Sequence, residues 1–147
     1  MFDIEFIAEE PELQEEGWWG LWGRTTLGDY SERFLAPLDR WQRGDYERQW
    51  IEAAERLLHQ SDRTGFSTQA GRFWWTMWRQ GERVYVHEEL LTPERLATLT
   101  AFDGAPYALI EDRVTRTEDG APISEWELTV ADVQAFVARR AGQYVPA

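Results

Sequence analysis

Phe73-Trp74-Trp75-Thr76-Met77-Trp78 is the stretch of this 147-residue chain that decides its fold. Side chains alternate between the two faces of a strand, so Phe73, Trp75 and Met77 would share one face and two further tryptophans the other. A strand with large apolar groups on both faces must be covered on both sides. The stretch therefore predicts a central strand, and Gln80-Gly81-Glu82 predicts the turn into its antiparallel neighbour.

Alternation and turn signals predict the other strands. Phe2, Ile4 and Phe6 alternate with two acidic residues, which is typical of a half-buried strand. By the same reasoning, strands are expected over residues 2–6, 18–27, 66–69, 72–79 and 83–91. A second hairpin is expected from residues 107–116 and 123–128, around a turn at Asp119-Gly120.

Apolar periodicity predicts two main helices. Residues 45–59 place their large apolar side chains on one stripe of a helix, with Asp45 as the expected N-cap. Thr129 and Asp132 form a capping-box pattern, which predicts the start of a C-terminal helix.

Two shorter helical segments are also expected. One lies within residues 31–41, where Pro37 limits its length, and the other runs from Thr92-Pro93-Glu94 to Leu99. Strands joined by hairpins dominate the expected elements, and strands do not alternate with helices along the chain. The predicted fold class is α+β in one domain spanning 1–147: an antiparallel β-sheet built from hairpins, with an aromatic core, packed by one main central helix and a C-terminal helix.

The charge balance restricts the partners and the location of the protein. The chain has 27 acidic residues against 15 arginines and no lysine, and its net charge is −12. Such a field repels nucleic acid and anionic membranes and attracts basic proteins, although a need for solubility also explains it. The start Met1–Phe6 has no signal-peptide pattern, and no apolar run approaches about 18 residues. We therefore expect a cytoplasmic protein.

Few residues could carry catalysis or hold a metal. The chain has no cysteine, and its two histidines are His59, at the end of the predicted helix, and His87, beside Glu88 and Glu89. Those two carboxylates could hold His87 in its charged form. No serine stands in a nucleophile elbow, and no metal or phosphate-binding motif occurs. We predict a protein that is not an enzyme and has no metal or cofactor; a hydrolase with paired carboxylates is an alternative.

One string of residues carries a family resemblance. It consists of Trp22-Gly23-Arg24-Thr25-Thr26-Leu27-Gly28-Asp29-Tyr30-Ser31-Glu32-Arg33-Phe34, Leu38, Trp41, Asp45-Tyr46-Glu47-Arg48-Gln49-Trp50 and Glu55-Arg56-Leu57, with later matches in 73–91 and in Ile123-Ser124-Glu125-Trp126. Over residues 18–128 the chain resembles the CdiI-type immunity proteins of bacterial contact-dependent growth inhibition.

The resemblance implies a non-catalytic function. Members of that family bind and neutralise the toxin domain at the C-terminus of a large exported CdiA-like protein, and so protect the producing cell. Many of these toxins are nucleases, which are basic because they hold phosphates. An acidic inhibitor would associate rapidly with a basic nuclease.

Exposed acids are the predicted partner-binding residues. They are Glu9, Glu10, Glu12, Glu15 and Glu16 in an acidic loop over residues 8–17, together with Glu88, Glu111 and Asp112. The loop could also be no more than a solvated connection. Four tryptophans recur at strand or helix spacing, which favours core positions: Trp22, Trp41, Trp50 and Trp126. The alternative function is a binding module whose aromatic groove takes a sugar or a peptide.

Overall fold

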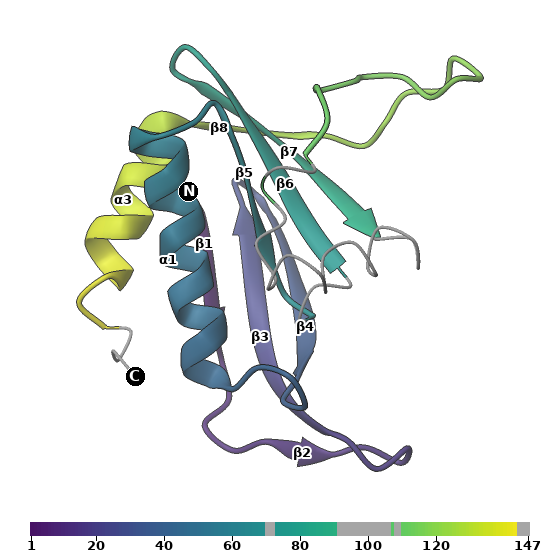
Figure 1. The fold of residues 1–147 in the computed structure, drawn as a ribbon, viewed down its shortest axis with the longest axis vertical. Helices are drawn as coiled ribbons and strands as arrows, with labels where there is room; N and C mark the ends of the chain where they lie inside the picture. Colours follow the sequence, from purple (N-terminus) through teal and green to yellow (C-terminus); the bar gives the residue numbers. More distant parts are fainter. Residues whose placement is uncertain (70–72, 91–106, 108–109, 144–147) are drawn as a thin grey trace.

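Two antiparallel sheets and two helices make up the described part of the protein (Figure 1). The computed structural model describes residues 1–69, 73–90, 107 and 110–143, so the short helix expected from Thr92 to Leu99 lies outside it. The elements are β1 Phe2–Phe6, β2 Glu12–Leu13, β3 Trp19–Leu27, β4 Tyr30–Pro37, α1 Arg43–His59, β5 Arg63–Ser67, β6 Phe73–Gln80, β7 Arg83–Leu90, β8 Trp126–Thr129 and α3 Val130–Arg140. The predicted α+β class, with an aromatic core and these two helices, is confirmed.

β3 is the central strand of the first sheet. β4 pairs along one edge of β3, while β1 and β2 pair with successive parts of its other edge. The helix expected within 31–41 is wrong, because most of this segment is β4. Gly28, at a φ of 64°, and Asp29 form a two-residue turn that carries the chain directly from β3 back along it. Gly28-Asp29 is itself a hairpin signal, and it outweighs the weak helical pattern.

β6 is an interior strand of the second sheet, whose order is β5-β6-β7-β8. Its residues Trp74 to Trp78 are all buried, as its two apolar faces predict. Gly81 takes a φ of 64° in the turn to β7, so the predicted hairpin is also confirmed.

The second predicted hairpin is wrong in its pairing. The turn at Gly120 is present, but within the described part of 107–128 its arms share a single isolated bridge, and β8 pairs instead with β7. Trp126 gives the physical reason. Its ring lies 5.0 Å from the Tyr30 ring and 5.4 Å from the Trp75 ring, so pairing with β7 places a large aromatic group against the core.

α1 begins at Arg43, two residues before the predicted N-cap. Asp45 lies inside the first turn, where its Oδ2 accepts a hydrogen bond from the backbone N–H of Gln42 at 2.8 Å. The Asp45 carboxylate still lies at the positive end of the helix dipole. Asp45 thus stabilises the start of α1 as expected, but from the first turn and not from the N-cap position. Tyr46 and Trp50 are fully buried on the predicted stripe.

The core is built from aromatic rings. The Trp50 ring lies 5.0 Å from Phe6 and 6.0 Å from Phe34, and its Nε1–H donates to the Ser67 carbonyl at 2.7 Å. The bond satisfies the polar end of a ring that is otherwise enclosed by apolar groups. Trp50 is thus in the core as expected, while Trp41 and Trp126 are half-buried and pack against it.

Phe34 packs across the first sheet onto a glycine. Gly23 pairs directly with Phe34, and a Cβ at Gly23 would lie 2.2 Å from Phe34 Cζ and 2.8 Å from the Glu5 carbonyl oxygen. Only a residue without a side chain leaves room for the ring. This close approach explains why a glycine stands in the middle of a strand.

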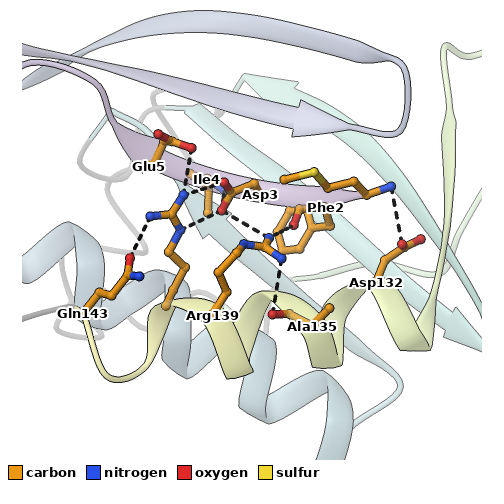
Figure 2. Close-up of polar contacts among 10 residues, drawn as sticks. Phe2, Asp3, Ile4, Glu5, Asp132, Ala135, Arg139 and Gln143 are labelled. Atoms are coloured by element: carbon orange, nitrogen blue, oxygen red, sulfur yellow. Dashed lines mark hydrogen bonds and ion pairs between the residues drawn. The ribbon is translucent and has the colours of Figure 1, made fainter.

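A buried ion pair fixes α3 to β1 (Figure 2). Asp3 accepts hydrogen bonds from Arg140 Nε at 2.9 Å and Nη2 at 2.6 Å, and the Asp3 side chain is only 4% exposed. Arg140 Nη2 also reaches Glu5 at 2.8 Å, and Arg139 donates to the Phe2 carbonyl at 2.7 Å. The cluster thus pairs charged side chains from the two ends of the chain: Asp3 and Arg140 are 137 residues apart in the sequence.

Arg140 decides which carboxylate of this cluster is ionised. Burial alone would raise the pKa of Asp3, but the hydrogen bonds and charge of Arg140 bring it below its usual value. The hydrogen bond with Asp3, followed by burial, raises the pKa of Glu5. As the pH falls, Glu5 therefore takes up a proton before Asp3 does.

We expect Asp3→Asn to lower the free energy of unfolding by about 3 kcal/mol at pH 7, because it leaves the half-buried Arg140 with only the Glu5 carboxylate. The folded pKa of Asp3 lies below the unfolded one, so its contribution is complete above about pH 5 and is lost as the pH falls through the folded pKa. Urea unfolding at several pH values measures both effects. The exposed Asp62→Asn is the control, and equal losses in the two variants would contradict the account.

Gly23→Ala should destabilise the protein by about 2 kcal/mol, because the new methyl group would push Phe34 out of the core. Gly44→Ala is the matched control: a Cβ at Gly44 meets nothing within 4 Å, and alanine favours a helix. Thermal unfolding should show a lower midpoint for the first variant and an equal or higher midpoint for the second. Similar midpoints would show that Phe34 does not depend on the glycine.

Candidate functional site

The structure divides the eight predicted acids among three places. Five of them, Glu9, Glu10, Glu12, Glu15 and Glu16, precede or belong to the hairpin of β2 and β3; Glu88 lines a cleft between the sheets; Glu111 and Asp112 lie in the segment before β8. Figure 1 shows the hairpin at the bottom of the molecule and the segment before β8 at the upper right. The acids therefore do not form one site.

The acidic loop over residues 8–17 is more ordered than a solvated connection. Its residues Glu12 and Leu13 form β2, and Gly17 takes a φ of 92° in the turn to β3. Glu12 Oε2 accepts a hydrogen bond from Trp22 Nε1 at 3.0 Å. Glu12 is thus held by the fold, while the remaining four acids of this set are exposed around the hairpin.

An exposed apolar pair lies at the centre of this hairpin. Leu13 and Trp19 are direct partners across β2 and β3, and they are 58% and 51% exposed. Sequence reasoning singled out neither residue. The sequence pattern around them, a strand that follows an acidic loop, does not indicate which face of the hairpin stays exposed to solvent. Tryptophan is among the residues that dominate the binding energy of protein interfaces.

A cleft of about 350 Å³ lies between the two sheets. Its aromatic walls come from β3, β4 and β6, and its polar lining includes Thr25, Glu32 and Glu88. Trp22 lies in this lining, half-buried, with the Arg33 guanidinium 4.6 Å from its ring centre. The expectation of a core position was therefore wrong for Trp22: its half-buried ring lies outside the core cluster and contacts a charged side chain of β4.

Comparison with known proteins decides the family. Residues 36–136 match the family model described as the CdiI N-terminal domain. The chain belongs to the CdiI family. The immunity protein CdiI of Enterobacter cloacae subsp. cloacae is 26% identical over 122 residues, which cover 75% of this chain and 79% of that protein. A chain of the "CdiA-CT/CdiI toxin and immunity complex from Enterobacter cloacae" has the same fold, with a TM-score of 0.75 and 24% identity over 97% of this chain and 99% of its own.

The resemblance to CdiI-type immunity proteins that the sequence predicted is thus confirmed. The family match begins at Ala36. The acidic hairpin, Thr25 on β3 and Glu32 on β4 all precede this point. Both candidate surfaces of this CdiI-family chain therefore involve residues that the family model does not describe.

Glu125 anchors the segment before β8 to the second sheet. Its carboxylate accepts two hydrogen bonds from Arg113, at 2.7 and 2.6 Å, and lies 2.6 Å from His87 Nε2. The Arg113 guanidinium also lies 3.7 Å from the ring centre of Tyr85. The carboxylate hydrogen-bonded to His87 thus comes from a residue 38 positions away, and not from the neighbouring acids that the sequence suggested.

Further contacts hold the two candidate acids of this segment. Arg63 donates to Asp112 Oδ1 at 2.7 Å and to the Ile110 carbonyl at 3.0 Å. Trp78 Nε1 donates to the Glu111 carbonyl at 2.9 Å. The charge of Asp112 is therefore already paired, while the Glu111 side chain is exposed. Of the two, Glu111 is better placed to meet a partner.

His59 pairs at 3.3 Å with Glu55 on the surface of α1. Within the described residues, no group of three or more His, Asp or Glu side chains could hold a metal ion. No helix in the described ranges is long and apolar enough to cross a membrane.

We expect Glu125→Gln to loosen residues 110–125 and to cost about 2 kcal/mol, because it removes two charge-assisted hydrogen bonds from Arg113. Those bonds, against the effect of burial, hold the pKa of Glu125 below its usual value. Its contribution is therefore present at neutral pH and is lost as the pH falls through the folded pKa. Faster amide exchange in 110–125 would confirm the anchor; exchange matching that of the exposed Glu118→Gln would contradict it.

Proposed function

We propose that this chain, acting as a single domain, is a non-catalytic immunity protein that binds and neutralises the C-terminal toxin domain of a CdiA-like exported protein in the cytoplasm. Membership of the CdiI family carries the proposal. The relative from Enterobacter cloacae is named an immunity protein, and the related structure is that of a toxin and immunity complex. One immunity protein would bind one toxin domain and cover its active site or substrate groove.

A basic nuclease is the toxin that the charge of this chain fits best. The net charge of −12 would steer a basic surface towards the protein and speed up their association. A nuclease must present such a surface to hold phosphates. The acids that stay exposed around the β2–β3 hairpin supply negative charge at one end of the molecule.

The hairpin is the proposed primary contact with the toxin. The Leu13–Trp19 pair offers apolar area, and the exposed Glu15 and Glu16 add negative charge in the turn between β2 and β3. An apolar centre with a charged rim is the usual arrangement of a tight protein interface, in which the rim excludes water. The ladder between β2 and β3 and the bond from Trp22 to Glu12 hold this surface in shape before the partner arrives.

Trp19→Ala should weaken toxin binding about 100-fold, because a central interface tryptophan is worth 2 kcal/mol or more. The half-exposed ring contributes little to the free protein, so its melting temperature should stay nearly unchanged. Val114→Ala is the control, since Val114 is similarly exposed (56%) in the segment before β8. Isothermal titration with the toxin domain encoded beside this chain measures both affinities. Equal affinities would exclude the hairpin as the main contact.

Charge removal at the same hairpin should act on the association rate. Glu15→Gln with Glu16→Gln should slow association and flatten its dependence on salt, whereas Glu52→Gln with Glu55→Gln on α1 removes equal charge away from the hairpin and should change less. In cells, the chain should rescue growth when that toxin is expressed. Failure both to bind the toxin and to rescue growth would refute the proposed function itself.

A further inference from the structure

The cleft between the sheets is lined by a buried hydroxyl group that is shielded from water and has no hydrogen-bond partner among the described residues. Thr25 lines the cleft and is 1% exposed, and its Oγ1 has no hydrogen-bond partner within the described part of the chain. A buried hydroxyl in this state costs free energy that a bound donor would recover. Thr25 pairs across β3 and β4 with Glu32, so an acidic residue is its direct neighbour in the sheet.

Two carboxylates face each other in the same cleft. Glu88 projects from β7, and burial followed by the neighbouring Glu32 carboxylate raises the pKa of Glu88. Glu32 Oε2 accepts a hydrogen bond from the Tyr30 hydroxyl at 3.0 Å, which holds it in position. Two like charges held together favour any cation that can lie between them.

The walls of the cleft favour a flat cation. Trp22 and Trp75 both line it, and the Arg33 guanidinium already lies over the Trp22 ring. A guanidinium stacks on aromatic rings and donates several hydrogen bonds in one plane, whereas an ammonium does neither as well. Among the lining residues, two carboxyl groups stand against the single guanidinium of Arg33, so the lining holds more acidic than basic groups.

We propose that the cleft receives an arginine side chain of the toxin domain, whose guanidinium donates to Glu32, Glu88 and Thr25 Oγ1 and lies between the aromatic walls. The identity of the donor protein rests on the proposed function. The chemistry of the cleft does not, since it follows from residues of this chain alone. The hairpin and the cleft would then bind the same basic partner at two places, joined by Trp22, which contacts both.

The free protein tests the cleft without any toxin. N-acetyl-arginine methylamide is titrated into the protein, and the indole N–H signals of Trp22 and Trp75 are followed by NMR. Saturable shifts are expected with this probe and not with the citrulline analogue, which has the same shape and no charge. Glu88→Gln should reduce the shifts. No response, an equal response to citrulline, or a response only to neutral oligosaccharides would overturn the proposal.

The complex tests whether the toxin uses the cleft. Glu32→Gln and Glu88→Gln should each weaken toxin binding about tenfold or more, as expected for loss of a charge-assisted hydrogen bond. Glu118→Gln removes the same charge from an exposed turn and should change affinity less than threefold. Thr25→Val keeps the shape of the side chain and removes a hydroxyl without a partner, so it should fold normally and still weaken binding.

The outcomes separate this inference from the proposed function. If the wild-type chain binds the toxin and all three cleft variants bind it equally well, the inference is wrong and the proposed function stands. If the wild-type chain does not bind the toxin, the proposed function is wrong, and the titration with the arginine probe alone decides what the cleft binds.

Discussion

The need to cover both faces of β6 organises this protein. One face presents Trp75 to the core, where its ring lies parallel to that of Phe66, and the first sheet and α1 complete that layer. The other face presents Trp78, whose Nε1 donates to the Glu111 carbonyl of the segment before β8 and whose ring contacts His87 of β7. A strand with a polar face would require neither the covering segment nor its Glu125 anchor.

Sequence alone predicts those parts of the fold that depend on local chemistry. Gly81 and the Thr129–Asp132 capping box act over a few residues, so the β6–β7 hairpin and the start of α3 followed directly from them. The strand within residues 31–41 and the pairing of β8 with β7 could not be predicted in this way, since each depends on packing between residues far apart in the sequence. Trp126 could pair in more than one hairpin, and the core contacts with Tyr30 and Trp75 decide between them.

The candidate site, too, is predicted by local sequence only in part. The acidic turn in the sequence predicts that Glu15 and Glu16 are exposed. The sequence does not show that Leu13 and Trp19 lie side by side on an exposed face of the hairpin. The cleft depends on bringing Glu32 and Glu88 together from different sheets. Trp22 connects the two surfaces, because its Nε1 donates to Glu12 of the hairpin and the residue is part of the cleft lining. Acidic charge and exposed aromatic area thus meet on the hairpin side of β3 and β4.

Amide hydrogen exchange of this chain, with and without its toxin domain, tests the central claim most directly, because it maps the bound surface without any substitution. The account predicts slower exchange in residues 9–22 and around Glu32 and Glu88, with little change along α1 and in the 116–122 turn. Protection confined to α1 and α3, with the β2–β3 hairpin exchanging as in the free protein, would contradict it.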